Sequence, residues 1–478
     1  MKKILIALLG VILALSAVFA PIALLFFETA SIEPQYTNTF YGALDEKYKR
    51  LTSIEEEKIV VVGGSSVAFG LDSALLEKYA KMPVVNFGLY ADIGTKFMLD
   101  LSRSGINEGD IVILQPELDE QTMSLYFSAD SALKACDDDF SMLDSLRTAD
   151  DRFAVLGALW NFNREKLGYL KEGKLDPVGM YNSKNFNEHG DIDRNKIKRV
   201  NNILRTYYDK TKPVKLDSSI VSDDFIAYLN EYIDYCEQRG AKVYFAFCPV
   251  NDLSVTKDSN IKAFEKYIKD NVNCEIIGSL RSSVMDSHYF YDTNFHLNDA
   301  GVRLRTLSLI DELLIKWDDL ETMVTEEPFD IPEYKYDAKY YGPEDENARF
   351  FTYEREVGYV ITGLTEEGKK QQTLTLPLGY DGYCVTEINT DIFADSACRK
   401  LIIPENTNIG AMSGGFKDSA NLTELWIYKF DESEIIPPSF DSKTQGIFVI
   451  YVPEGSGYTG GYYWGKAGGF MKEFKTEQ

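Results

Sequence analysis

The stretch of sequence that decides the fold is Lys58-Ile59-Val60-Val61-Val62-Gly63-Gly64-Ser65-Ser66. A continuous β-branched run of this length is typical of a strand buried on both faces, as in a parallel sheet. The glycines and serines after it place a hydroxyl group at the carboxyl end of the strand, where open α/β sheets bind ligands. The same Gly-Gly-Ser-Ser segment is also explained as a tight turn with a helix cap, so alone it does not establish a site.

Further runs of the same kind follow along the chain, at residues 84–87, 111–114, 243–247 and 275–277. Helical patterns lie between or after them, over residues 72–81, 94–104, 223–238, 260–270 and 298–317. This alternation predicts an α/β fold with a flavodoxin-like, doubly wound parallel sheet. Residues 120–220 interrupt it as a polar, mostly helical insertion, which either shapes substrate access or is decorative.

The amino terminus predicts export from the cytoplasm. Lys2 and Lys3 precede 24 uncharged residues, Ile4 to Phe27, a run long enough to span a bilayer and longer than the usual core of a signal peptide. Basic residues before the run and Glu28 after it place the body of the protein outside. We interpret residues 1–30 as an uncleaved transmembrane anchor at the cell membrane, with an extracellular C-terminal body. Secretion after signal cleavage is the alternative.

The composition limits the partners and the domain count. A formal charge of −25 disfavours nucleic acid and anionic lipid surfaces. The length of 478 residues predicts two or three domains. Residues 31–55 are expected to connect the anchor to an α/β domain over 56–317. Residues 318–347 hold eleven acidic residues against two lysines, which predicts a linker.

The cysteines give no sign of a metal or redox site. None of the six forms a C-x-x-C pair, so the sequence implies neither a metal nor a cofactor. Cys384 and Cys398 are candidates for a disulfide bridge.

Residues 348–478 contain a repeat. Phe393, Phe416 and Phe440 are spaced 23 and 24 residues apart, and a β-rich run follows each of them, at residues 401–404, 425–427 and 449–453. A period in the low twenties with one strand per repeat is typical of leucine-rich repeats. The pattern resembles the bacterial surface-antigen type of these repeats, which implies a C-terminal leucine-rich-repeat stack. A protein or glycan is the candidate ligand of this stack, and the alternative is a stabilising appendage with no ligand.

A second segment carries chemistry: Asp292-Thr293-Asn294-Phe295-His296-Leu297-Asn298. It lies just past the last sheet strand and before the last helix. A serine nucleophile needs a histidine as base and a carboxylate that fixes the histidine tautomer, and one short loop supplies both here. Of the other two histidines, His189 is expected to be solvated, and His288 is a second-sphere or surface residue.

Together these segments resemble the SGNH (GDSL-like) hydrolase superfamily. Val62 to Ser66 matches its first block, with Gly64 in place of the usual Asp, and Asn86-Phe87-Gly88 matches the second. The resemblance implies Ser65 as nucleophile, with Ser66 as the alternative. It further implies His296 as base, Asp292 as its orienting partner, and the amides of Ser65 and Gly88 as oxyanion donors.

Two features depart from the usual pattern. The third block of the family supplies an Asn side chain to the oxyanion hole, whereas this chain has Leu114-Gln115-Pro116-Glu117. Either Gln115 substitutes for that Asn or the hole is weaker. The Asp-to-His spacing is also one residue longer than the commonest form. Both departures resemble a membrane-anchored branch that acts on envelope polymers, in teichoic-acid D-alanylation and polysaccharide O-acetylation.

The resemblance therefore implies an extracytoplasmic serine esterase or O-acyltransferase that acts on acyl esters of cell-envelope glycopolymers. The alternative is a catalytically degenerate surface-binding or adhesion protein that uses the repeats.

Overall fold

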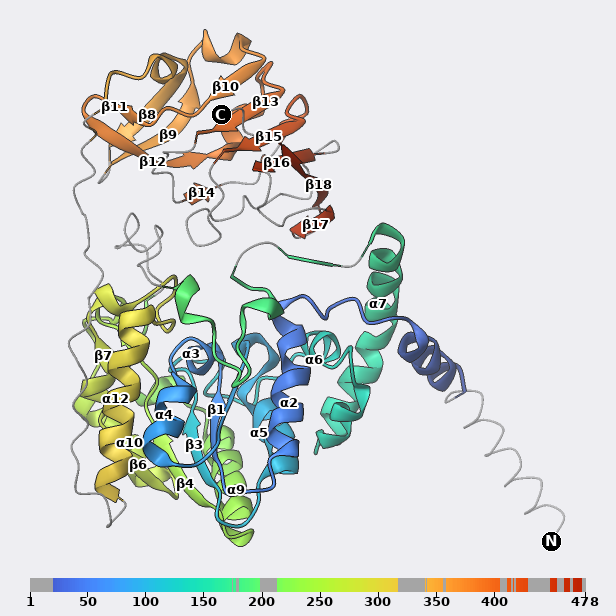
Figure 1. Ribbon diagram of the computed structural model, residues 1–478, viewed down its shortest axis with the longest axis vertical. Helices are drawn as coiled ribbons and strands as arrows, with labels where there is room; N and C mark the ends of the chain where they lie inside the picture. Colours follow the sequence, from blue (N-terminus) through green and yellow to red (C-terminus); the bar gives the residue numbers. More distant parts are fainter. Residues whose placement is uncertain are drawn as a thin grey trace, which may run out of the picture.

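The computed structural model describes residues 20–316, with gaps at 174, 178–179 and 198–212. Towards the carboxyl terminus it describes residues 340–474, with gaps at 341, 356–357, 405–410, 414–415, 417, 429–447, 454–459 and 465–466. The protein is mixed α/β with parallel sheets, as the strand and helix patterns predict. Figure 1 shows an α/β body over residues 20–316 and a β-rich body made from the later residues.

Five parallel strands form the central sheet of the first body, in the order β2-β1-β3-β4-β6. Each lies within one or two residues of a predicted run: β1 (Ile59–Gly63), β2 (Val84–Gly88), β3 (Ile111–Gln115), β4 (Lys242–Ala246) and β6 (Glu275–Ile277). The first three strands are buried along their whole length. This burial explains why they are continuously apolar rather than alternating.

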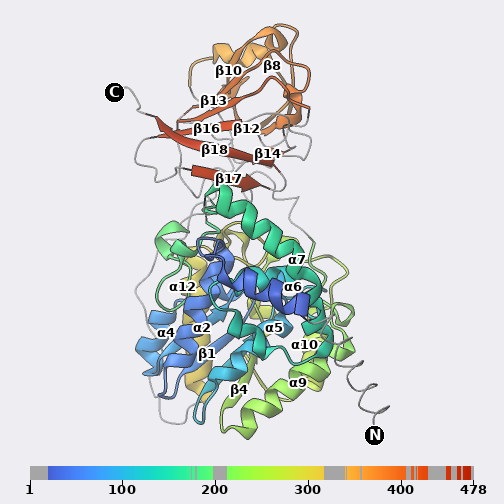
Figure 2. The ribbon, with the colours of Figure 1, turned by 90° about the vertical axis from the view of Figure 1, so that its right-hand side faces the viewer.

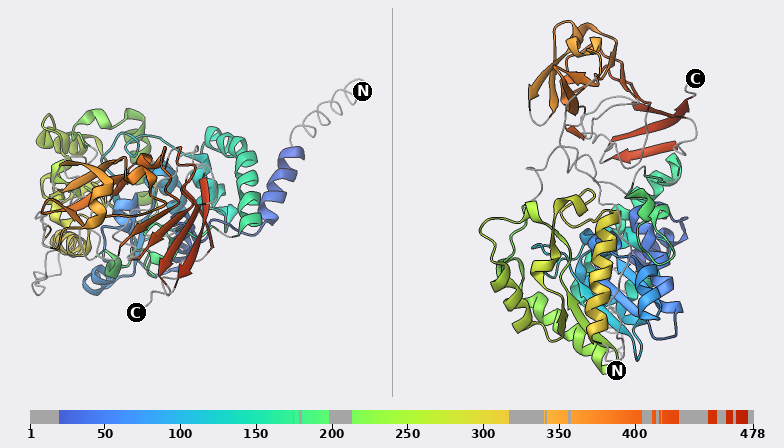
Figure 3. Two further views of the ribbon diagram at one scale, coloured as in Figure 1. Left: turned by 90° about the horizontal axis from the view of Figure 1, so that it is seen from above. Right: turned by 60° about the vertical axis from the view of Figure 1, so that its left-hand side comes forward.

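Helices cover both faces of this sheet because alternate strand residues point to opposite sides. Ile59 and Val61 pack with α4 (Ser73–Ala80) and α12 (Asp299–Lys316), which lie side by side in Figure 3. Val60 and Val62 face the other core. The helices contributing to that core include α2 (Ala43–Ser53), α5 (Thr95–Ser102), α9 (Asp223–Gln238) and α10 (Ile261–Asn271).

Smaller elements complete this body. The two-residue strands β5 (Val250–Asn251) and β7 (Val284–Met285) pair with each other, and α11 (Leu280–Ser283) precedes β7. The first part of the insertion forms α6 (Ala129–Ala135) and α7 (Ala149–Glu172). Figure 2 shows these two helices outside α2 and α5.

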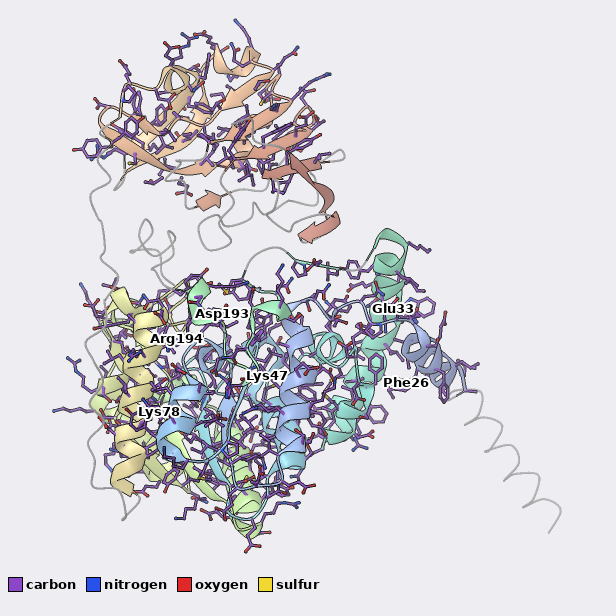
Figure 4. All side chains as sticks on the ribbon, viewed as in Figure 1. Phe26, Glu33, Lys47, Lys78, Asp193 and Arg194 are labelled. Atoms are coloured by element: carbon purple, nitrogen blue, oxygen red, sulfur yellow. The ribbon has the colours of Figure 1, made fainter. Side chains whose placement is uncertain are left out.

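Residues 20–31 are helical and pack beside α7. Asn163 donates a hydrogen bond to Thr29 Oγ1 at 2.8 Å, and the rings of Phe26 and Phe140 lie 5.8 Å apart. Phe26 is labelled in Figure 4. Of the predicted apolar run Ile4–Phe27, residues 4–19 lie outside the described part of the chain. None of the helices within the described part combines the length and apolar character that a membrane crossing needs.

The described residues of the second body form two sheets. One has the order β10-β13-β15-β16-β18-β17 and the other the order β11-β12-β9-β8, with β14 (Ala411–Ser413) paired to β12. The strands of the first sheet are β10 (Thr373–Thr375), β13 (Lys400–Ile403), β15 (Glu424–Ile427), β16 (Phe448–Pro453), β17 (Gly460–Trp464) and β18 (Ala467–Phe474). Those of the second are β8 (Phe351–Arg355), β9 (Tyr359–Leu364), β11 (Gly379–Tyr380) and β12 (Tyr383–Asn389).

The predicted repeat strands are neighbours in the first of these sheets. Leu401 of β13 pairs with Leu425 of β15, and Leu425 pairs with Ile450 of β16, all in parallel register and buried. Phe393 and Phe416 are buried and stack with ring centroids 6.1 Å apart. Phe440 and most of the predicted linker 318–347 lie outside the described residues.

The predicted disulfide is wrong, since Cys384 and Cys398 are not joined to each other and both are buried reduced cysteines, like Cys136, Cys236 and Cys248. Burial of a reduced thiol needs no partner because cysteine packs as a small apolar residue.

A buried ion pair at the amino ends of β1 and β3 gives a stability prediction. Lys58 Nζ lies 2.9 Å from Asp110 Oδ2, and both side chains are fully buried. Replacing Asp110 with alanine leaves an unpaired buried ammonium group, so we expect a loss of about 3–5 kcal/mol in the free energy of unfolding. Urea unfolding measures this loss. The control is Asp270→Ala, which breaks the exposed Lys266–Asp270 pair and should cost less than about 1 kcal/mol. Equal losses in the two variants would contradict the prediction.

Candidate active site

The carboxyl ends of β1, β2 and β3 lie level with one another. Gly63 pairs with Gly88 on one side and with Gln115 on the other. The short helix α3 (Ser65–Ala68) begins directly after β1, so Ser65 is its first residue. Glycine is required at position 88 because a Cβ atom there would lie 2.4 Å from Val67 Cβ of α3. The first two predicted sequence blocks therefore meet at one edge of the sheet.

Ser65, His296 and Asp292 form a continuous hydrogen-bonded line at this edge. Ser65 Oγ lies 2.8 Å from His296 Nε2, and His296 Nδ1 lies 2.8 Å from Asp292 Oδ1. Ser65 and His296 are buried, with 6% and 4% of their surface exposed. An ionised carboxylate is an acceptor only, so Asp292 favours the tautomer with the proton on Nδ1 and a free lone pair on Nε2.

The loop before α12 explains how one short segment supplies both the base and its partner. Tyr291 N–H donates to the carbonyl of His296 at 2.8 Å, and Asn298 N–H donates to the carbonyl of Tyr289 at 2.9 Å. These bonds close the chain between Asp292 and His296, so the two side chains project to the same side. The His296 ring also stacks on Phe69, with centroids 4.0 Å apart and planes at 5°.

Ser65 rather than Ser66 faces the histidine. The Ser66 hydroxyl is fully buried and has no hydrogen-bond partner among the described residues. Its amide donates to Glu117 Oε1 at 2.7 Å. The geometry therefore favours Ser65 where the sequence left both serines open.

Glu117 is the residue that reaches Ser65 from the end of β3. Its Oε1 lies 3.0 Å from Ser65 Oγ, and the whole side chain is buried. Gln115 is buried at the strand end, and among the described residues no hydrogen bond joins its side chain to Ser65. Burial is the largest influence on the Glu117 carboxyl and raises its pKa, while the neighbouring His296 opposes that rise.

The second predicted oxyanion donor is already bonded. Gly88 N–H donates to Asn86 Oδ1 at 3.2 Å, while the Asn86 amide group donates to the Val67 carbonyl at 2.9 Å and to Asp191 Oδ1 at 2.8 Å. The Ser65 amide belongs to the first residue of a helix and therefore has no acceptor within that helix. Gly88 is placed at the site, but its amide would have to leave Asn86 to bind an oxyanion.

The insertion contributes Tyr181 to the site. Tyr181 donates a hydrogen bond to Asp292 Oδ2 at 2.8 Å, and its hydroxyl lies 3.4 Å from His296 Nδ1. Burial raises the pKa of Tyr181 well above its usual value, so the hydroxyl stays protonated and remains a donor. Asp292 thus accepts one hydrogen bond from His296 and a second from Tyr181 of the insertion. The insertion therefore contributes a side chain to the candidate site.

Later residues of the insertion tie it to the sheet. Arg194 bonds Asp72, the N-cap of α4, and donates to Asp299 Oδ1 at 2.6 Å in the first turn of α12. Figure 4 labels this arginine beside both helices. The sequence predicted a solvated His189, but this histidine has protein partners. Its Nε2 lies 3.1 Å from Glu77 Oε2, and its carbonyl accepts a hydrogen bond from Asn86 N–H.

Sequence reasoning missed Glu117, Tyr181 and Phe69 as site residues. Glu117 had one usable signal, since it is an acidic residue two positions after Gln115 at the end of a buried strand. Tyr181 had none, because its place depends on how the insertion folds back. Phe69 follows the serine block by three residues, but many apolar residues in the chain lie equally close to a candidate segment. Its position in the sequence therefore does not mark it as a site residue.

No family model matches the chain, and no curated protein matches it. Among solved structures it is similar to protein YXIM of Bacillus subtilis, with 10% identity and a TM-score of 0.27, over 55% of this chain and 58% of that one. A second similarity is to the C-terminal domain of glucosamine-fructose-6-phosphate aminotransferase from Francisella tularensis. It has 11% identity and a TM-score of 0.12, over 60% of this chain and 95% of that one. At these TM-scores neither similarity bears on the fold or the function.

Proposed function

We propose that this protein is a serine esterase or O-acyltransferase of the SGNH type. The observation that carries the proposal is the line from Ser65 Oγ through His296 to Asp292, with 2.8 Å at each contact. The strand order β2-β1-β3-β4-β6, which is that of flavodoxin-like sheets, also supports it. The site lies at the carboxyl end of those strands, where such sheets bind ligands.

In this proposal, Ser65 Oγ attacks the carbonyl carbon of an ester while His296 Nε2 accepts the serine proton. That proton then passes to the leaving oxygen as its bond to carbon breaks. Water or a sugar or polyol hydroxyl next attacks the acyl-enzyme, with His296 again as base. Asp292 keeps its charge and stabilises the imidazolium that forms.

The substrate class and the location are further parts of the proposal. The resemblance to envelope-acting SGNH proteins favours acyl esters of cell-envelope glycopolymers. The uncharged run Ile4–Phe27 supports an anchor that holds the site outside the membrane. The register of Leu401, Leu425 and Ile450 supports a leucine-rich-repeat stack in the second body.

The direct test uses the full chain in detergent with chromogenic acetyl, propionyl and butyryl esters. We expect release of the alcohol above the rate given by heat-denatured protein. Adding glycerol as acceptor separates transfer from hydrolysis, because transfer yields a new ester in place of free acid. No turnover of any ester would contradict the proposal.

Tyr181→Phe is expected to lower kcat/KM by about tenfold to a hundredfold, since it removes a hydrogen bond to a charged carboxylate. The reason is that Asp292 keeps only its bond to His296 and is held less firmly. The control is Tyr235→Phe, which removes a hydrogen bond to the Arg103 carbonyl outside the site. If both variants kept the wild-type kcat/KM, Tyr181 would have no part in positioning Asp292.

A binding protein is the second candidate, and one feature of the second body favours it. On a single sheet face, Trp426 and Tyr451 stack with centroids 4.1 Å apart, and Lys400 Nζ lies 3.8 Å from the Trp426 ring centre. All three side chains are partly exposed. Partly exposed aromatic rings of this kind suit a sugar or a protein ligand.

A further inference from the structure

The Glu117 side chain fills the space beside Gly64. A Cβ atom added at Gly64 would lie 2.8 Å from Glu117 Oε1 and 2.9 Å from its Cδ. A side chain at position 64 and the Glu117 carboxyl in its present place therefore exclude each other. The family that the sequence resembles has an aspartate at the position of Gly64. The glycine at this position and the placement of the Glu117 carboxyl after β3 therefore depend on each other.

The contacts of Ser65 constrain the proton on Glu117. The serine hydroxyl has one proton and two neighbours, His296 Nε2 at 2.8 Å and Glu117 Oε1 at 3.0 Å. An ionised Glu117 is an acceptor only, so it competes with His296 for that proton. A protonated Glu117 instead donates to Ser65 Oγ and leaves the serine proton to His296. Only the second arrangement directs the serine to its base.

We propose that Glu117 is a catalytic residue that works as a neutral carboxylic acid, donating a hydrogen bond to Ser65 Oγ at rest and to the oxyanion during attack. This role rests on the proposed acyl chemistry. It gives the site a neutral side-chain donor at the strand end where, among the described residues, the Gln115 side chain makes no hydrogen bond to Ser65.

The proton count is consistent with this role. When the new Oγ–carbon bond forms, the carbonyl π electrons move to the carbonyl oxygen and the serine proton moves to His296 Nε2. Oγ is then an alkoxy oxygen of the tetrahedral intermediate and a weaker acceptor than the adjacent oxyanion, so the Glu117 O–H group turns to the oxyanion. Glu117 keeps its proton throughout. An ionised Glu117 would instead put a second negative charge beside the oxyanion.

The surroundings of Glu117 favour the neutral form. Burial raises the pKa of its carboxyl, and no lysine or arginine bonds it among the described residues. The bond from Ser66 N–H at 2.7 Å acts against this rise, as does the neighbouring His296, but burial outweighs both and the pKa of Glu117 remains raised. Three charged or titratable groups face Glu117: His296 from the loop before α12, Asp119 on the same segment as Glu117, and Cys248 after β4. Arg305 of α12 acts on Cys248 in turn. Burial raises the pKa of the Cys248 thiol, so this neighbour is uncharged at neutral pH.

The variant that tests the role is Glu117→Gln, which cannot ionise but still offers an N–H donor and a carbonyl acceptor. We expect kcat/KM for a chromogenic acetyl ester at pH 6 to fall by no more than about a hundredfold, because part of the hydrogen bonding is kept. Wild-type kcat/KM should fall about tenfold per pH unit above the pKa of Glu117, and Glu117→Gln should lose this alkaline limb. The matched control is Glu120→Gln, an exposed glutamate three residues on, which should follow the wild-type profile.

A second measurement on the full chain does not depend on turnover. The infrared difference spectrum, wild type minus Glu117→Gln, should show the C=O stretch of a carboxylic acid at pH 6, and wild type minus Glu120→Gln should not. A carboxylate band at that pH would overturn the proposal. A Glu117→Gln rate as low as that of His296→Ala, or an unchanged alkaline limb, would overturn it too. If the wild type hydrolyses no ester, the acyl chemistry and the catalytic role fail together, whereas an acid band would still establish the neutral carboxyl.

Discussion

Ser65→Ala is expected to lower kcat for ester hydrolysis by about 10⁴-fold or more, because it removes the hydroxyl oxygen that forms the acyl-enzyme in the proposed mechanism. The fold should not change, since within the described residues Ser65 Oγ makes hydrogen bonds only with His296 and Glu117. Initial rates with a chromogenic acetyl ester, corrected for the folded fraction from circular dichroism, measure this loss.

Two variants control this prediction. Ser66→Ala removes a buried hydroxyl that has no partner in the described part of the chain, so it should keep most of the activity. Ser65→Ala combined with His296→Ala should be little worse than either single change, because the members of such a line act as a unit. Full activity in Ser65→Ala, or a greater loss in Ser66→Ala, would refute the assignment of Ser65.

Asp292→Asn is expected to lower kcat by about 10⁴-fold while leaving the site geometry intact. The physical reason is the tautomer of His296. An asparagine amide can donate to Nδ1, which moves the imidazole proton to Nε2 and leaves no lone pair for the serine proton. Tyr181 keeps an acceptor, since the asparagine carbonyl takes the place of the carboxylate oxygen it contacts at 2.8 Å.

The matched control for this change is Asp258→Asn, at an exposed aspartate near Lys215. Its kcat should equal that of the wild type. Nitrogen-15 NMR of His296 gives an independent readout, with the proton on Nδ1 in the wild type and on Nε2 in Asp292→Asn. A full rate with an unchanged tautomer would show that Asp292 does not orient the histidine.

The sheet could be predicted because its strands are buried on both faces. Burial of that kind leaves a continuous apolar run, as at Ile59–Val62, and the helices between the runs follow the usual periodicity. The predicted strand at 401–404 and those after it were also found, since Leu401, Leu425 and Ile450 must all face one core. In the same body, the Cys384–Cys398 bridge was predicted wrongly because free buried cysteines leave the same sequence signal as bridged ones.

The candidate site could be predicted only in part. Ser65 stands out because it is the first residue of the helix after β1, and Asp292 and His296 stand out because they share the short loop that precedes α12. Glu117 and Gln115 are two residues apart and leave the strand on the same side, so the sequence cannot say which reaches the serine. Tyr181 approaches from an insertion whose path depends on distant contacts, including that of Arg194 with Asp72 and Asp299.

The measurement that tests the central claim most directly is capture of the acyl-enzyme. The full chain is mixed briefly with a chromogenic acetyl ester, quenched in acid, digested and analysed by mass spectrometry, beside His296→Ala treated in the same way. The account predicts an acetyl group on Ser65 in the wild type and none in His296→Ala, where the serine is present but has no base. An adduct on Ser66 or elsewhere, equal labelling of the two proteins, or turnover with no adduct at Ser65 would contradict it.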